Sequence, residues 1–161
     1  MSIKINLERP LPRTRLVSCF TRASNWVPAE NKVLDTVSGL SVMTGPKMVY
    51  IRGDVVEGSQ DYRGYAINLG FSREGGAASF TREYFTELRQ AIADYYRQVE
   101  SPHVGLVLEG TFNVAPSNTG DGSATVFGRD VVVLEIVQAL PINPRRVNAS
   151  AAPLTLEAVG L

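Results

Sequence analysis

The stretch that decides the fold is SFTREYFTELRQAIADYYRQVESPHVGLVLEGTFNV, residues 79–114. Its first part carries apolar residues at helical spacing, which make one stripe: Phe85, Leu88, Ile92, Tyr96 and Val99. Ser79 or Thr81 can cap the start of such a helix, and Pro102 cannot continue it. The pattern therefore predicts a helix over residues 80–100.

Strands are predicted on both sides of this helix. Three segments precede it and two follow it: 32–44, 47–58, 62–72, 104–114 and 129–142. The first is broken by Gly39 and predicts a strand or a bent hairpin, whereas residues 62–72 alternate strictly and predict a half-buried strand. The last has Val, Leu and Ile on both faces, which is typical of a central strand covered on both sides.

The element order β-β-β-α-β-β predicts a mainly β fold with one long helix, of the α+β class. We expect a small antiparallel barrel or sandwich over residues 32–142, with the helix closing one end. The Gly-rich and Ser-rich segment 115–128 predicts a long loop. Residues 1–31 and 143–161 are rich in proline and predict extended arms that add a strand to another surface.

Charge is unevenly placed although the net charge is zero. Residues 1–25 hold five Lys or Arg and one acid, whereas residues 26–144 hold nine basic and fourteen acidic residues. A basic arm on an acidic body can bind nucleic acid, can bind the acidic body of a neighbouring copy, or can be a solvated tail.

The sequence offers no recognisable catalytic or metal-binding set. His103 is the only histidine and Cys19 the only cysteine, and neither stands in a triad or ligand spacing. We therefore expect a non-enzyme without a cofactor or metal. No leader sequence and no apolar run of membrane-spanning length is visible, so no membrane partner is expected. The segment 73–79, REGGAAS, could bind an anion or be a plain loop.

Two families are similar to this chain. The layout of arms, β-rich body, flanking helix and long hairpin loop resembles the ring-forming, tail-tube-like proteins of bacteriophage virions. The resemblance implies a structural subunit of a virion, made in the host cytoplasm, that forms a ring or tube with its own copies and contacts other virion proteins. Its arms and the 115–128 loop would make the contacts. The subunit-interface candidates are Arg13, Arg15, Val17, Phe20, Arg22, Trp26, Arg145 and Arg146. Deleting residues 1–25 should then leave a folded monomer that no longer assembles.

The alternative resemblance covers residues 32–142. The runs HVGLVLEGTFNV (103–114) and DVVVLEIVQALP (130–141) resemble the last strands of OB-fold single-stranded DNA-binding proteins of bacteria, although the acidic tail of that family is absent. It implies a cytoplasmic protein that binds single-stranded nucleic acid. The candidate residues are Tyr50, Arg52, Tyr65 and Phe112, of which Tyr65 also fits the core face of its strand.

Overall fold

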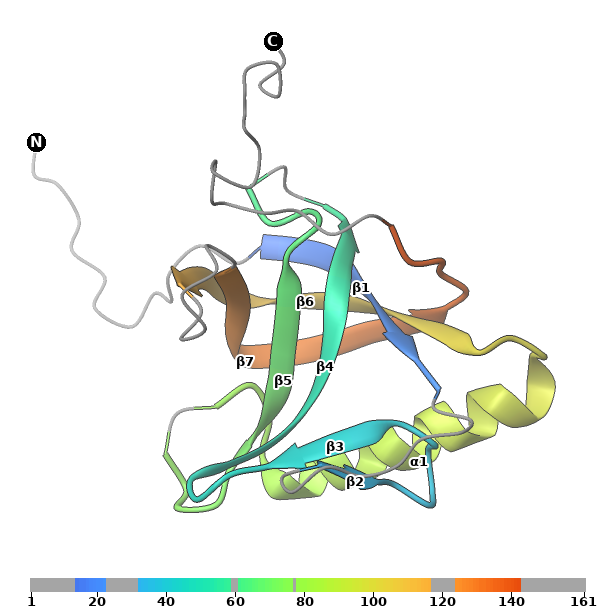
Figure 1. Cartoon of the computed structure of the whole chain (residues 1–161), viewed down its shortest axis with the longest axis horizontal. Coiled ribbons are helices and arrows are strands. Elements are labelled where there is room, and N and C mark those ends of the chain that lie inside the picture. Colours follow the sequence, from blue (N-terminus) through green and yellow to red (C-terminus); the bar gives the residue numbers. More distant parts are fainter. Residues whose placement is uncertain (1–13, 23–31, 59–60, 77, 117–123, 143–161) are drawn as a thin grey trace, which may run out of the picture.

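In the computed structural model, the described residues are 14–22, 32–58, 61–76, 78–116 and 124–142, and they form one mixed β-sheet with one helix (Figure 1). The elements follow the chain as β1 Thr14–Thr21, β2 Lys32–Leu34, β3 Ser41–Thr44, β4 Met48–Glu57, β5 Ala66–Ser72, α1 Arg82–Gln98, β6 His103–Pro116 and β7 Ala124–Val137. The prediction of a mainly β fold with one helix is confirmed.

Helix α1 lies inside the predicted range 80–100. Thr81 is its N-cap, and the Thr81 hydroxyl accepts a hydrogen bond from the Tyr84 backbone N–H at 3.1 Å. Phe85, Leu88 and Ile92 from the predicted stripe are buried. Amphipathic spacing alone was sufficient to identify this element.

The three segments before the helix that were predicted as strands contain β2 and β3, β4, and β5. Residues 32–44 form the β2–β3 hairpin, with Gly39 in the left-handed region at φ +77°. The alternation in residues 62–72 corresponds to β5, whose Ile67, Leu69 and Phe71 are buried. A half-buried strand of this kind needs one apolar face, which is what the alternation indicates.

The strand order differs from the predicted one. It runs β1-β6-β7-β5-β4-β3-β2, and β1 also pairs with β4. Starting at β1, the pairings therefore run through β6, β7, β5 and β4 and back to β1. All neighbours are antiparallel except β5 and β7, which pair in parallel. The expected antiparallel arrangement is wrong at this pair, because the connection between them contains α1 and β6 and is long enough for a crossover.

The expectation that all of residues 1–31 form an arm is wrong for Thr14–Thr21. This segment is β1, and it pairs with β6 in unbroken register from Thr14 opposite Gly110 to Thr21 opposite His103. Leu16 and Phe20 are each 1% exposed, because alternate side chains of β1 point into the core. Residues 1–13, 23–31 and 143–161 lie outside the described residues.

Two expectations about the end of the chain need correction. Ala124 to Gly128 were expected in the 115–128 loop but belong to β7, while Ala115 and Pro116 belong to β6. Residues 129–142 were expected to be covered on both sides. Instead, Val132 is 45% exposed and Leu134 is 44% exposed. Apolar residues at both sets of alternate positions in this segment predicted that both faces are covered. Apolar side chains can also remain exposed at a protein surface, as they do here.

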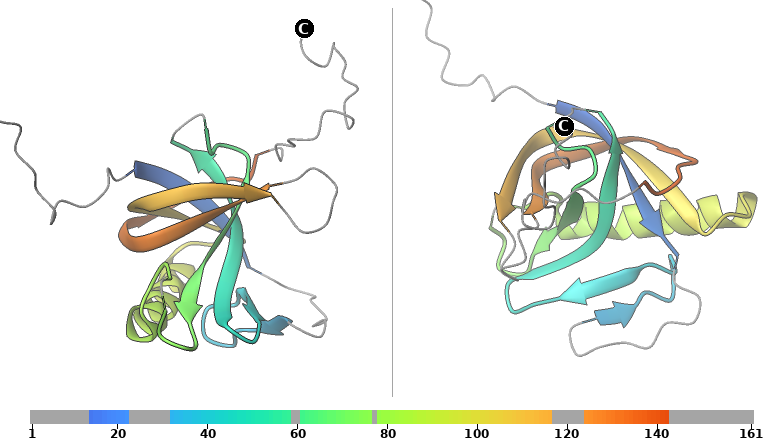
Figure 2. Two further views of the ribbon diagram at one scale, coloured as in Figure 1. Left: turned by 90° about the vertical axis from the view of Figure 1, so that its left-hand side faces the viewer. Right: turned by 45° about the horizontal axis from the view of Figure 1, so that its top comes forward.

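Helix α1 and the β2–β3 hairpin lie at the same end of the molecule (Figure 2). The Arg89 guanidinium of α1 binds the Asp35 carboxylate after β2 through Nε at 2.9 Å and Nη2 at 2.7 Å. On the core side, the rings of Phe71 and Phe85 meet edge to face with centroids 5.3 Å apart. Polar and aromatic contacts together hold the helix against the sheet.

Candidate functional site

A groove of about 600 Å³ crosses the outer side of β4, β5, β7 and β6. We call it the sheet groove. The side chains that give it chemical character are Tyr50, Arg52, Asn68, Asn113, Phe127 and Arg129. The groove therefore combines aromatic rings, guanidinium groups and amides on one surface.

Strand register explains why these side chains meet. Arg52 lies opposite Asn68, Asn68 opposite Phe127, and Phe127 opposite Asn113, which makes one row across four adjacent strands. Directly opposed residues in a sheet point to the same side. The Arg52 Nη1 donates a hydrogen bond to Asn68 Oδ1 at 3.3 Å. Side chains from four separate strands thus share one surface row.

The next row brings β4 and β5 close together beside Tyr50. The partner of Tyr50 on β5 is Gly70. A Cβ at Gly70 would lie 1.9 Å from the Val49 carbonyl oxygen and 2.5 Å from the Tyr50 Cβ, so close backbone packing requires glycine here. Tyr50 and Gly70 both line the groove.

The nucleic-acid candidates from the sequence separate into two pairs. Tyr50 and Arg52 line the groove, as the stacking hypothesis requires. Tyr65 is 9% exposed and Phe112 is 7% exposed, and both belong to the hydrophobic core. These two rings cannot stack on a ligand at the surface. Phe127 and Arg129 were missed because they lay in or beside the expected loop, although the alternation in residues 124–129 could have identified them.

A second surface is the outer side of β1, β6 and β7, which we call the β1–β6–β7 face. Register aligns Arg15 with Glu109 and Val132 in one row, and Val17 with Val107 and Glu135 in the next. Val132 on this face is 45% exposed and Val17 is half-buried, whereas Ala139, after β7, packs against Gly105 and Cys19 farther along β6 and β1. The side chains of Val17 and Val132 are therefore in contact with solvent.

The interface candidates from the sequence are dispersed. Arg15 and Val17 lie on the β1–β6–β7 face, and Arg15 forms a 3.2 Å ion pair with Glu109. The Arg22 guanidinium lies 4.8 Å from the ring centroid of Tyr96. Phe20 is a core residue and cannot contact a partner. The remaining candidates lie outside the described residues: Arg13, Trp26, Arg145 and Arg146.

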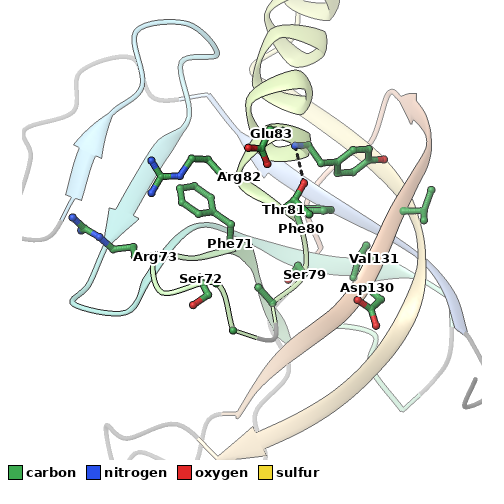
Figure 3. A pocket seen from close by; sticks show the side chains of 15 residues that line it. Phe71, Ser72, Arg73, Ser79, Phe80, Thr81, Arg82, Glu83, Asp130 and Val131 are labelled. Atoms are coloured by element: carbon green, nitrogen blue, oxygen red, sulfur yellow. Dashed lines mark hydrogen bonds between the residues drawn. The ribbon is translucent and has the colours of Figure 1, made fainter.

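The REGGAAS segment borders a different hollow, of about 710 Å³, at the start of α1 (Figure 3). Arg73 and Arg82 line it, but so do Glu83 and Asp130. The Thr81 hydroxyl is engaged by the Tyr84 N–H (dashed in Figure 3), and Arg82 lies over the ring of Phe71. The hollow has mixed charge and does not single out an anion.

The single cysteine and the single histidine both make structural contacts. Burial, followed by the nearby Asp54 carboxylate, raises the pKa of the Cys19 thiol, which favours the uncharged form. The His103 Nδ1 and the Thr21 hydroxyl are 3.1 Å apart, linking the ends of β6 and β1. Within the described ranges, no three acidic, Cys or His residues gather into a possible metal site.

No protein-family model, curated protein or solved structure matches this chain. In the described part of the chain, no helix combines the length and apolar character needed to cross a bilayer.

Proposed function

We propose that this protein is a non-enzymatic structural subunit of a repeating assembly, in the tail or head–tail structure of a bacteriophage virion. The observation that carries the assembly is the β1–β6–β7 face, with exposed Val132 and Leu134 beside half-buried Val17 and Val107. The virion setting rests on the resemblance in layout.

The chemistry of the face supports contact with a second copy of the chain. Contiguous apolar groups on a sheet surface are stabilised when another surface removes them from water. Charges of both signs border these groups, with Arg15 on β1 and Glu135 on β7. A neighbouring copy can place an acidic side chain of a different patch near Arg15, and such head-to-tail contacts repeat into rings or filaments.

The test is the mass of the full-length, nuclease-treated protein in solution. Light scattering on the wild type should give a discrete oligomer. The variant Val132→Lys should shift the mass towards the monomer, since it replaces an exposed apolar group of the contact with a charge. Lysine is suitable because position 132 lies opposite Glu109, which can pair with it in the monomer.

Val33→Lys is the matched control. Val33 is 53% exposed on β2, at the far end of the strand order, so its substitution should leave the mass of the oligomer unchanged. A wild-type protein that stays monomeric at every concentration would overturn the proposal. So would equal dissociation of both variants.

A further inference from the structure

We propose that the sheet groove binds single-stranded nucleic acid, with bases stacked on Tyr50 and Phe127 and phosphates bound by Arg52 and Arg129. This inference goes beyond the assembly function and uses a different set of residues. It depends on what lines the groove, on how exposed those groups are and on the local balance of charge.

Two aromatic rings line the groove, Tyr50 and Phe127. Phe127 is 42% exposed in the middle of a sheet row, although neighbouring Val126 is fully buried. Tyr50 is half-buried and lines the same groove. Aromatic rings on a sheet surface offer stacking platforms that accept any base, because every base has a π-face.

The charged residues that line the groove, among those described, are basic. The described residues that line the groove include Arg52 and Arg129 but no Asp or Glu. This contrasts with residues 26–144 as a whole, where fourteen acids outnumber nine basic residues. Two guanidinium groups without a lining carboxylate favour an anionic ligand, and guanidinium geometry suits phosphate.

The polar side chains of the groove lie in one row across the strands. Asn68 lies between Arg52 and Phe127 in the cross-strand row, and Asn113 lies at its other end. Amide side chains can donate to and accept from base edges. Rings, cations and amides spread over four strands match an extended ligand with alternating bases and phosphates, and single strands present both.

A bulge positions the arginine at one end of the groove. The pairing of β6 with β7 shifts register between Glu109 and Thr111, and Asp130 has a left-handed φ of +52°. Arg129 lines the sheet groove, whereas the next residue, Asp130, lines the hollow at the start of α1. A β-bulge can re-aim side chains in this way. Here it places the cation in the groove and the acid on the other side.

The experiment is a fluorescence anisotropy titration of full-length, nuclease-treated protein with a labelled oligothymidylate. The wild type should bind at low salt. A plot of the logarithm of affinity against the logarithm of salt concentration should fall with a slope of about −0.7 for each phosphate contacted. Arg52→Gln and Arg129→Gln should each reduce that slope by about this amount. Phe127→Leu should weaken binding about 5-fold or more with little change in slope.

Arg97→Gln is the matched control for charge. Arg97 is exposed near the end of α1, where it pairs with Asp94. Its substitution changes the net charge by the same amount as Arg52→Gln or Arg129→Gln but does not alter the groove. A labelled duplex of the same length should bind more weakly, because its bases are not free to stack. A mononucleotide should compete poorly, since it offers one base and few phosphates.

Three results would overturn the proposal. The first is no binding by wild type at low salt, and the second is an Arg97→Gln variant as weak as the groove variants. The third is a mononucleotide or duplex that binds as well as the single strand. Val132→Lys should retain binding in the same assay, so failure of the assembly proposal and failure of this one remain distinguishable.

Discussion

At the scale of single residues, the carboxylate of Asp35 accepts hydrogen bonds from several groups at once. Besides the two bonds from Arg89, it accepts one from the Ser38 hydroxyl at 2.5 Å and one from the Val37 N–H at 3.1 Å. Burial raises the pKa of Asp35, but the hydrogen bonds from Arg89, Ser38 and Val37 outweigh it and lower the pKa to about 2.

Asp35→Asn is therefore expected to lower the free energy of unfolding at neutral pH by about 2 kcal/mol. The unfolded carboxyl titrates near pH 4 and the folded one near pH 2, so this stabilisation is complete above about pH 4 and is lost as pH falls towards 2. Urea unfolding of both proteins across this range measures it.

Asp94→Asn is the control, because Asp94 forms an exposed pair with Arg97 and should cost less than about 1 kcal/mol. The difference between wild type and Asp35→Asn should shrink as the acid limit is approached. A constant difference over the whole pH range would contradict the assignment of the ionised carboxylate as the stabilising species.

At the scale of elements, α1 depends on its cap and on its buried stripe. Thr81→Ala removes the acceptor for the Tyr84 N–H and should lower the free energy of unfolding by about 1 kcal/mol. Thr86→Ala is the matched control. Thr86 is exposed within the helix and its hydroxyl bonds to the Arg82 carbonyl, so alanine should be neutral or slightly stabilising there. Thermal unfolding of both variants measures the difference, and equal midpoints would contradict the capping role.

At the scale of the whole molecule, β1 joins two parts of the sheet. It pairs with β6 along its full length and with β4 at Val17, Ser18 and Cys19. At this crossing, a Cβ on Gly53 would lie 2.5 Å from the Cys19 carbonyl oxygen, so β4 requires glycine there. Arg52, Gly53 and Asp54 are thus part of a paired strand.

Deleting residues 1–22 should therefore abolish cooperative unfolding instead of leaving a folded monomer. The deletion removes Leu16 and Phe20 from the core and leaves strand edges on β6 and β4 without a partner. Circular dichroism during heating of the truncated and full-length chains checks this. A sharp transition in the truncated chain would show that β1 is dispensable.

Much of the fold is local and could be predicted. Periodicity identified α1 and β5, and Gly39 identified the bend between β2 and β3, because each depends on spacing within one segment. Tyr50 and Arg52 of the sheet groove were named as stacking candidates from residue type, since aromatic and guanidinium groups on strands suit single-stranded ligands. The partners on β7 could not, because residues 115–128 have the composition of a loop.

By itself, the sequence determined a mainly β chain with one amphipathic helix, whose boundaries follow from a cap and a proline. Tertiary structure alone decided that Thr14–Thr21 belongs to the sheet, that β5 pairs with β7 in parallel, and that one side of β7 remains uncovered. The physical reason is that strand pairing joins residues distant in sequence. Local pattern reports which face of a strand is apolar, but not which strand lies beside it or what covers that face.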